Sequence, residues 1–478
     1  MTLDTGSTHS RSPLMPTIPE LQEHQSYWST ALITSVCIAC VSSIQYGYHM
    51  SELNAPEHLI KQDLLLTDSQ IGLITSIFSI GGLISSTFAS QISISYGLKI
   101  GFIITSFFYI IGSFIEATAA SYTKMLAGRF LSGVGGGFAI VFVPLYANEV
   151  SPVAIRGLLG SMTQVSVNVG ILATQLLALH LSNEQNWRLL LWTGVFNGFF
   201  ALILSAFMLE ESPKWLSMTS GNKSAALAAL CRLREQDPRI CEREIESWEK
   251  ERVHSEDHTA ETSGKQKVSL ATYLTQSSYR NSRLIATITM VGQQFAGINS
   301  VIFYGVRILK DSFPEWSVML NCLISVLNVV ITSVASAFLD KAGRKPLLLL
   351  SLSLMTFSLL ALSFGVLHGS STTTVLSIFM YVGSFAIGCG PIPFLLVSEV
   401  SQPEVKDIAQ SWATDCNWVS VFIVGSLFPV LNEFIGGYTY LIFAIVCILF
   451  AGFTWNIIPE TKGKNTYYEV WLGAQRSD

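Results

Sequence analysis

Long apolar segments recur along the whole chain, and they constrain the fold more than any other feature of the sequence. A helix needs about 20 mostly apolar residues to cross the hydrocarbon core of a bilayer. Twelve such segments occur, at 29–48, 70–92, 99–120, 124–147, 157–181, 188–209, 283–309, 317–339, 346–367, 372–397, 410–431 and 438–458. The sequence therefore predicts an all-α membrane protein with twelve transmembrane helices.

Charged residues are scarce for a chain of this length. They make up 13% of the 478 residues and hydrophobic residues make up 50%, whereas a soluble domain carries roughly 25% charged residues. Much of the surface is therefore expected to face lipid. The eight cysteines lie in apolar segments or in the charged central stretch. We expect no structural disulfide, and their spacing matches no metal site.

Sequence patterns typical of other functions are missing. The apolar segments contain no nucleophile constellation, metal-ligand spacing or phosphate-binding loop, and the chain has no basic surface interleaved with aromatic residues. These absences argue against an enzyme, a bound cofactor or metal, and a nucleic-acid partner.

The positions of Lys and Arg predict the orientation in the membrane. When both termini are placed in the cytoplasm, most of the 28 Lys and Arg residues fall in cytoplasmic loops, as the positive-inside rule requires. The first residues, up to about Trp28, lack the pattern of a secretory signal. We expect 1–28 and 459–478 to be cytoplasmic tails, the first of them disordered.

The two groups of six segments resemble each other. Glu149-Val150-Ser151 in the first half matches Glu399-Val400-Ser401 in the second, and each Glu precedes a cation by seven residues, Arg156 or Lys406. Two further pairs of short motifs follow the same order at a similar spacing. We predict two six-helix halves, 29–209 and 283–458, around a site near the middle of the membrane, which is an alternating-access layout.

The segment between the halves, 210–282, is charged and differs from both. Two amphipathic patterns occur in it, one with Leu227, Leu230 and Leu233 and one with Ile240, Ile245 and Trp248. A linker with short interfacial helices would explain them. The alternative, which we favour because apolar stripes need a surface to pack against, is a cytoplasmic helical bundle that latches the halves together when the inside is closed.

Seven motifs in one order give a resemblance to a known family. They are Gly128-Arg129-Phe130, Pro144 to Glu149 with Arg156-Gly157, Glu211-Ser212-Pro213-Lys214-Trp215-Leu216, Gln293-Gln294-Phe295-Ala296-Gly297-Ile298-Asn299, Asp340-Lys341-Ala342-Gly343-Arg344-Lys345, Gly390-Pro391-Ile392-Pro393 and Pro459-Glu460-Thr461-Lys462-Gly463. From about 30 to 470 the chain resembles the sugar-porter family of the major facilitator superfamily. Tyr46-Gly47-Tyr48 with Asn54-Ala55-Pro56 is similar to glucose facilitators and to a fungal subgroup that is partly vacuolar.

Uncharged amides inside the apolar segments suit a sugar. An amide offers a donor and an acceptor to a hydroxyl group and carries no charge to desolvate. The resemblance implies sugar contacts at Gln164, Gln293, Gln294, Asn299, Asn328, Asn417 and Trp418, with Phe385 and Phe394 as aromatic walls. The alternative is that these amides bond only to neighbouring helices. For Gln293, Gln294 and Asn299 together we favour the sugar site.

Charged residues at the predicted cytoplasmic helix ends suggest a gate. We expect Glu149 to pair with Arg156 and Glu399 with Lys406, and the resemblance implies that these pairs interact with Asp340, Arg344, Glu211 and Glu460. Such a network would hold the inside closed. Solvated loop charges, worth under about 1 kcal/mol each, are the alternative, and the duplication in both halves argues against it.

Some positions depart from the family pattern. Proton-coupled members carry an Asp in span one near an Arg in span four, and here Arg129 is kept while His49 takes the other place. Glu52, Glu116 and Asp415 match no familiar coupling position. His49 can titrate near neutrality, so His49 and Arg129 remain candidates for coupling to protons. Other departures are Ile94, Ser95 and Leu98 in the first-half loop, Met290, Ala386 and Phe394.

These observations predict a carrier and leave its substrate open. We expect transmembrane transport of a hexose-type sugar, by facilitated uniport in preference to proton symport, in the plasma membrane or the vacuolar membrane. A sugar sensor that does not transport, and a carrier of another polyol such as inositol, are the alternatives. The eroded 94–98 loop is compatible with the sensor, and the departures in spans seven and ten argue against glucose itself more than against the sugar class.

Overall fold

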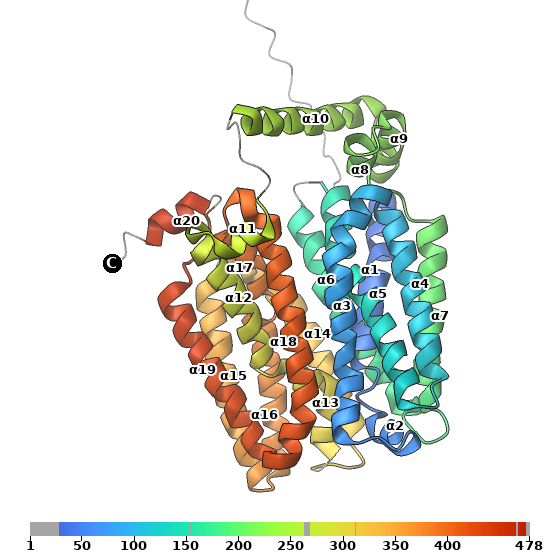
Figure 1. The fold of residues 1–478 in the computed structure, drawn as a ribbon, viewed down its shortest axis with the longest axis vertical. Helices are drawn as coiled ribbons and strands as arrows, with labels where there is room; N and C mark the ends of the chain where they lie inside the picture. Colours follow the sequence, from blue (N-terminus) through green and yellow to red (C-terminus); the bar gives the residue numbers. More distant parts are fainter. Residues whose placement is uncertain (1–27, 153–154, 262–267, 311, 465–466, 475–478) are drawn as a thin grey trace, which may run out of the picture.

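Two helical bundles lie side by side in the structure, and a smaller group of helices lies across one end (Figure 1). The computed structural model describes residues 28–152, 155–261, 268–310, 312–464 and 467–474. Within these ranges the chain forms helices and no β-strand. The predicted all-α class and its two halves are confirmed.

The first half is built from six long helices and one short one. They are α1 (Thr30–Ser51), α2 (Glu57–Asp63), α3 (Asp68–Tyr96), α4 (Leu98–Ala117), α5 (Tyr122–Val150), α6 (Arg156–Leu181) and α7 (Trp187–Phe207). Local sequence fixes the helix starts. Thr67 and Gln70, for example, form a capping box at the start of α3, which satisfies two backbone groups that the helix leaves unpaired.

The second half repeats the plan with two broken helices. It contains α12 (Arg280–Phe295), α13 (Ile298–Lys310), α14 (Ser317–Ala342), α15 (Arg344–Leu367), α16 (Ser371–Ser384), α17 (Ile392–Val400), α18 (Lys406–Ile435) and α19 (Thr439–Ile457). The expected continuous span 283–309 is divided between α12 and α13, and 372–397 is interrupted by a π-helical turn at Phe385–Cys389. Continuity was the one wrong expectation for these spans.

Ten helical stretches among the described residues are long and apolar enough to cross a membrane. The difference from twelve has two causes. Neither piece of the broken α12–α13 span reaches the required length, and α18 and α19 count as one stretch, Pro403–Ile457. Large apolar side chains are exposed on the outside of the helices, Phe207 at 82% and Phe434 at 80%. An apolar exterior of this kind is expected where helices face lipid.

The internal repeat is visible in backbone detail at the end of the bundle that carries α10, which we call the α10 end. Gly97 and Gly343 precede α4 and α15 with positive φ of 85° and 93°. The Glu211 carboxylate accepts from the backbone amides of Leu98 and Lys99, and Glu460 accepts from those of Arg344 and Lys345. Each carboxylate therefore caps the start of the third membrane span of its own half, α4 or α15, if the broken α12–α13 is counted as one span. The helix dipole favours negative charge at this position.

The segment between the halves forms three short helices and one long one, α8 (Pro213–Met218), α9 (Lys223–Arg234), α11 (Leu270–Thr275) and the long α10 (Pro238–Glu261). The two predicted amphipathic patterns pack together, because Leu230 of α9 and Ile245 of α10 share one small core. Arg234 donates to the Val150 carbonyl, and the amide of Ala31 donates to Glu235. These contacts join α9 to the first half, so the predicted latch between the halves stays a prediction.

Of the two predicted cytoplasmic tails, only the C-terminal one contains a described helix. Residues 1–27 lie outside the described part of the chain. In the other tail, α20 (Tyr467–Ala474) packs against α17, and the Trp471 indole donates to the Val400 carbonyl at 3.3 Å.

Candidate functional site

The two helix breaks of the second half lie beside each other and share hydrogen bonds. Gly297, at φ of 96°, ends α12 and lets α13 start in a new direction. The Tyr381 hydroxyl of α16 donates to the Ala296 carbonyl at 2.8 Å. In return, the Gln293 amide of α12 donates to the carbonyls of Cys389 and Gly390, both at 2.8 Å. Each break thus supplies the partners for backbone groups that the other break leaves unpaired.

Four of the predicted amides lie beside the two helix breaks and are linked by hydrogen bonds into one series, called the amide chain. Asn417 donates to the Gln293 oxygen at 3.0 Å, and Gln294 donates to the same oxygen at 3.3 Å. Asn299 donates to the Gln294 oxygen at 2.5 Å. Both donors and the acceptor of Gln293 are therefore used, so its observed role is structural as well. Unused hydrogen-bonding capacity is left at Gln294, Asn299 and Asn417.

The other two predicted amides belong to a second series of hydrogen bonds, which runs from one half of the protein to the other. Gln164 of α6 donates to Asn168 at 3.5 Å, and Asn168 donates to Thr332 of α14 at 3.0 Å. Thr332 donates to Asn328 at 3.2 Å. Asn168 and Thr332 were missed by the sequence analysis. Each lies four residues after a predicted site residue, a spacing that puts both on one helix face.

Aromatic side chains extend the site toward the first half. Trp418 packs edge-on against Tyr46 at 6.0 Å and lies 6.5 Å from Phe78. Its indole nitrogen is buried and has no hydrogen-bond partner among the described residues. Phe385 begins the π-helical turn whose Cys389 carbonyl accepts from Gln293. Phe394 packs in a core that includes Met290, whose sulfur lies 3.7 Å from the amide nitrogen of Asn417.

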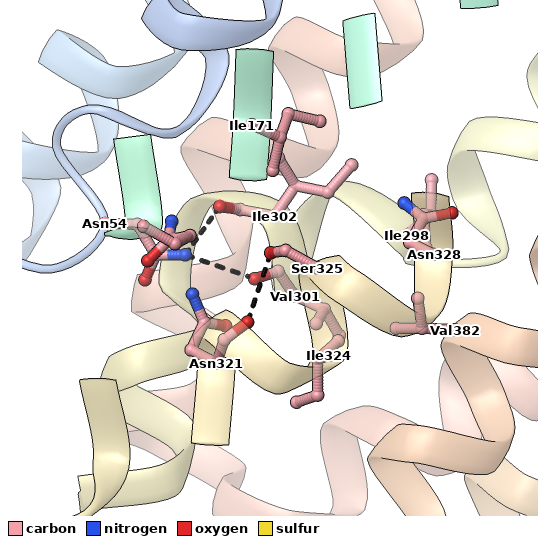
Figure 2. Close-up of a pocket in the computed structure, with 11 residues that line it drawn as sticks. Asn54, Ile171, Ile298, Val301, Ile302, Asn321, Ile324, Ser325, Asn328 and Val382 are labelled. Atoms are coloured by element: carbon pink, nitrogen blue, oxygen red, sulfur yellow. Dashed lines mark hydrogen bonds between the residues drawn. The ribbon is translucent and has the colours of Figure 1, made fainter. Parts of the chain in front are cut away.

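A small cavity opens between α6, α13 and α14 (Figure 2). Asn328, a predicted site residue, lines it together with Ser325, Asn321 and Gln175. Ile298, next to Asn299 in sequence, lines it as well. The cavity is therefore adjacent to the amide chain.

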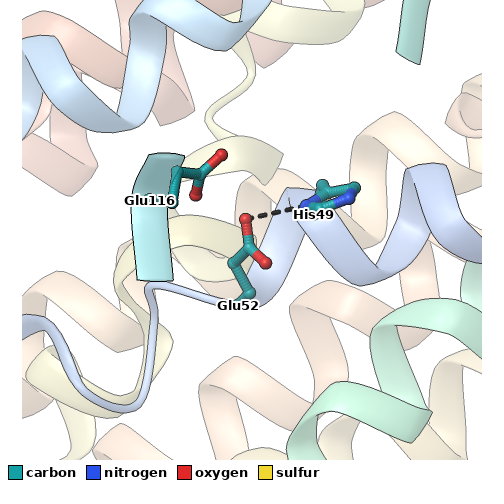
Figure 3. Close-up of side chains that lie close together, drawn as sticks. All are labelled: His49, Glu52 and Glu116. Atoms are coloured by element: carbon teal, nitrogen blue, oxygen red, sulfur yellow. Dashed lines mark hydrogen bonds and ion pairs between the residues drawn. The ribbon is translucent and has the colours of Figure 1, made fainter. Parts of the chain in front are cut away.

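A charged cluster is buried in the first half (Figure 3). Arg129 of α5 donates to Glu52 at 2.7 Å, and Nδ1 of His49 lies 2.8 Å from the same Glu52 oxygen. Glu116 of α4 lies 3.9 Å from Arg129 and accepts from Ser132 at 2.6 Å. All four ionisable side chains are at most 1% exposed. The predicted pair His49 and Arg129 is brought together, and two acids without a predicted partner join it.

The surroundings of this cluster fix the imidazole of His49. Tyr109 stacks on it at 5.0 Å, and Ser113 lies 3.4 Å from Nε2. The Arg129 guanidinium lies over the Phe78 ring at 4.8 Å. One ligand atom from each of His49, Glu52 and Glu116 falls within 4.8 Å of the others, a spacing that could hold a metal ion. Because Arg129 already binds Glu52, a guanidinium supplies the positive charge there.

Bonds between the halves gather toward the opposite end of the bundle, which carries α2 and is called the α2 end. Arg307 of α13 pairs with Glu57 at 3.0 Å and with Asp68 at 2.7 Å. Asn54 donates to the Ile302 carbonyl at 2.7 Å and accepts from the amide of Val306 at 2.9 Å. The Asn54-Ala55-Pro56 motif thus positions a side chain that holds α13.

Closer to the middle, a further contact continues this connection. The hydroxyls of Ser76 on α3 and Ser426 on α18 lie 2.5 Å apart. These hydrogen bonds and ion pairs join the halves at the α2 end and near the middle, where Asn168 of α6 also donates to Thr332 of α14. The α2 end is therefore the closed end in this conformation.

The predicted gate charges at the α10 end bond within their own halves. Arg344 donates to Glu399 at 3.0 Å, and Thr461 donates to the other oxygen of Glu399 at 2.5 Å. Lys406 is exposed, so Glu399 is paired with Arg344 and not with Lys406. One oxygen of Glu149 is buried without a hydrogen-bond partner in the described part of the chain. The side chains of Arg156 and Asp340 lie outside that part.

Glu211 and Glu460, which were predicted to join the gate network when the inside is closed, cap α4 and α15 in this conformation, because backbone amides at a helix start attract a carboxylate. The eroded 94–98 loop keeps this arrangement, since Gly97 and Glu211 remain. A side chain at Gly97 would bring its Cβ within 2.3 Å of the Glu211 carboxylate. Burial raises the pKa of Glu211, and hydrogen bonds from the amides of Ser212, Lys99 and Leu98 oppose that rise.

Comparison with known proteins gives a consistent result. Residues 20–470 match the family model described as sugar (and other) transporter. A probable metabolite transport protein of Saccharomyces cerevisiae is 42% identical over 92% of this chain and 95% of its own. Vacuolar protein sorting-associated protein 73 of the same yeast is 34% identical, over 95% and 98% of the two chains.

More distant proteins match over similar lengths. The human solute carrier family 2, facilitated glucose transporter member 3, is 30% identical over 91% of this chain and 90% of its own. Among solved structures, the xylose transporter XylE from E. coli, in a partially occluded inward-open conformation, aligns with a TM-score of 0.78 at 22% identity. That alignment covers 91% of this chain and all of XylE.

Proposed function

The chain belongs to the sugar transporter family, and we propose that it carries a neutral hexose-type sugar across a membrane by facilitated uniport. The observation that carries this proposal is the chain of uncharged amides from Asn417 to Asn299 at the two helix breaks. A sugar presents hydroxyl groups that both donate and accept. Amides left partly unsatisfied near the middle of the bundle match such a solute and have no charge that would select an ion.

Alternating access follows from where the halves are joined. Arg307, Asn54 and Ser76 close the α2 end in this conformation, so the solute would enter and leave from the α10 end. For the other state these bonds must break, and Glu399 and Arg344 would face partners across the α10 end. The distribution of Lys and Arg supports a cytoplasmic location for the α10 end and both termini.

The membrane we propose is that of the vacuole, with the plasma membrane as the alternative. A relative that is 34% identical over nearly the whole chain is named for vacuolar protein sorting, and this supports the first choice. Localisation of a tagged copy of the full chain distinguishes the two membranes.

A second candidate is proton-coupled transport, and the cluster around Arg129 is the observation that favours it. Glu52 and Glu116 share one guanidinium in a fully buried place. Two ionised carboxylates and one guanidinium leave an excess negative charge, which is costly inside a membrane. A proton on one of the three titratable side chains would remove that excess. Binding and release of this proton could then be linked to transport.

Uptake into liposomes tests both candidates in one experiment. Purified protein is reconstituted and supplied with a panel of labelled hexoses and inositol, with and without an imposed pH gradient. Uniport predicts saturable uptake to equilibrium with the same initial rate in both conditions. Accumulation driven by the gradient, and lost in His49→Asn or Glu52→Gln, would replace uniport by symport.

The same panel of sugars distinguishes the two remaining hypotheses, a sugar sensor and a carrier of another polyol. A sensor would bind a sugar and show no flux above that of empty liposomes. A carrier of another polyol would take up inositol and leave the hexoses outside. If no neutral polyol is either bound or moved, the proposed function is wrong.

A further inference from the structure

A fully buried amide beside the proposed sugar site has no protein partner. Neither the nitrogen nor the oxygen of the Gln175 side chain on α6 bonds to any described residue, although its exposure is 0%. The side chain lines the cavity of Figure 2. An unpaired buried amide is destabilising, and each such group in a folded protein needs an explanation.

The polar lining of this cavity is uncharged. Asn321 and Ser325 of α14 lie along it with Asn328. The Ser325 hydroxyl donates to the Asn321 backbone carbonyl at 3.1 Å, so its oxygen is left to accept. The oxygen of Asn328 accepts from Thr332, so the amide nitrogen of Asn328 is left to donate. Gln175 contributes unused groups of both kinds. This combination suits a hydroxyl group, which donates and accepts at once.

The rest of the lining is aliphatic and limits what can fit. Ile171, Ile298, Val301 and Ile324 are among these residues. A charged group would lose its hydration against them without gaining a counter-ion. A hydroxyl or hydroxymethyl group on a carbon skeleton meets both kinds of wall.

The position of the cavity relates it to the ends of a bound solute. Ile298, in its lining, directly precedes Asn299 of the amide chain. Asn54 lines it as well and is held by its bonds to α13, which tie the halves at the α2 end. The cavity therefore lies between the amide chain and that closure. A solute bound to the amides would extend its other end into this space.

We infer that Gln175, together with Asn321 and Ser325, forms a second polar subsite that binds a hydroxyl group on the end of the sugar facing the α2 end. This inference rests on the proposed function, because it assigns one end of the same solute. None of these three residues belongs to a motif that pointed to the site. The subsite gives the carrier a way to select among sugars that differ at that one hydroxyl.

Binding of deoxy sugars tests the subsite. The hexose that binds the wild type best is compared with its monodeoxy analogues by calorimetry on purified protein. We expect one analogue to bind the wild type about tenfold more weakly, roughly the value of one good hydrogen bond. In Gln175→Met, which keeps a similar volume, the parent sugar should weaken to the level of that analogue. The two should then bind equally, while the other analogues keep their ranking.

A neighbouring substitution serves as the matched control. Thr174 is equally buried and precedes Gln175 on α6, but its hydroxyl is satisfied by the carbonyls of Tyr48 and Gly170. Thr174→Val should keep the wild-type pattern of discrimination. Without sugar, Gln175→Met should melt at the wild-type temperature or above, because it removes an unpaired amide.

The outcomes separate this inference from the function on which it rests. If Gln175→Met keeps the wild-type discrimination against every analogue, the subsite is wrong and the sugar site stands. A lower melting temperature with equal weakening for all sugars indicates a structural or water-binding role and also overturns it. If the wild type binds no sugar or polyol at all, the proposed function fails and this inference fails with it.

Discussion

At the scale of single residues, the site depends on amides whose bonds are only partly used by the protein. Asn299 donates one hydrogen bond to Gln294 and is 2% exposed. A sugar hydroxyl that bonds to the remaining groups replaces no strong protein contact. Gln293 differs, because its bonds brace the π-helical turn, and changing it would damage the fold and the site together.

Asn299→Ala should therefore weaken sugar uptake without unfolding the protein. We expect the KM of the transported hexose to rise at least tenfold, since about one to two hydrogen bonds are lost, with little change in melting temperature. Asn456→Ala is the control, because the Asn456 side chain donates to the Gly452 carbonyl of its own helix and to no other described residue. Equal KM values for Asn299→Ala and the wild type would remove Asn299 from the site.

The buried cluster predicts an order of stabilities. Glu52→Gln should lower the melting temperature strongly, because Arg129 loses the charge that it contacts at 2.7 Å and breaking a buried pair costs about 3–5 kcal/mol. Glu116→Gln should cost less, since Glu116 lies 3.9 Å from Arg129 and a Gln oxygen can still accept from Ser132. Thermal unfolding in detergent measures both variants. The reverse order would contradict the closer pairing of Arg129 with Glu52 than with Glu116.

Sequence reasoning could find the type of site residue but not its partners. Gln164, Asn328 and the amides of 293–299 were predicted because they are uncharged polar groups in apolar segments and because the family resemblance pointed to them. Gln175 stands out in the same way, but the resemblance did not point to it. Glu52 and Glu116 were noticed as acids and left without a role, since only the packing of α4 and α5 brings both to Arg129.

At the scale of elements, the two broken spans do most to shape the site. The apolar length of each segment predicted every spanning helix. The breaks were not predicted, because eleven of the twelve predicted spans contain Gly and a Gly inside a membrane helix is often only a close-packing position. At Gly297 the reason is different, since φ is 96° and an added Cβ would lie 2.4 Å from the Phe443 ring.

Gly297→Ala should therefore destabilise the protein and impair binding at once. A residue with a side chain in this conformation costs about 1–3 kcal/mol, and the clash with Phe443 adds to that cost. We expect a clear drop in melting temperature together with weaker sugar binding. Gly452→Ala is a matched control in α19, because a Cβ there meets nothing within 4 Å. Equal melting temperatures for the two variants would show that Gly297 is not a required break.

At the scale of the whole molecule, ion pairs join the two halves at the α2 end, and a hydrogen bond from Asn168 to Thr332 joins them nearer the middle. Arg307 contributes ion pairs across the halves, whereas Arg188 at the same end pairs with Asp63 inside the first half. Only the first arrangement has to break when the α2 end opens. Transport then depends on how easily these few bonds are exchanged for others at the α10 end.

Arg307→Gln should shift the conformational equilibrium toward an open α2 end. A loss of about 1 kcal/mol changes a population roughly fivefold. In a Ser76→Cys background, a membrane-impermeant maleimide supplied from the α2 side should label Cys several times faster with this substitution. Arg188→Gln, in the same background, should leave the labelling rate unchanged. Identical rates for the two variants would mean that Arg307 does not hold the α2 end closed.

Alternating access around the amide site can be tested by locking the α2 end reversibly. Ser76 and Ser426 lie on opposite halves with their hydroxyls 2.5 Å apart, close enough for the pair Ser76→Cys and Ser426→Cys to form a disulfide. The measurement is hexose uptake by the double variant in liposomes before and after reduction, beside the two single variants. We predict that the oxidised double variant binds sugar without transporting it, and that reduction restores uptake. Undiminished uptake by the fully oxidised protein would show that transport does not require opening of the α2 end.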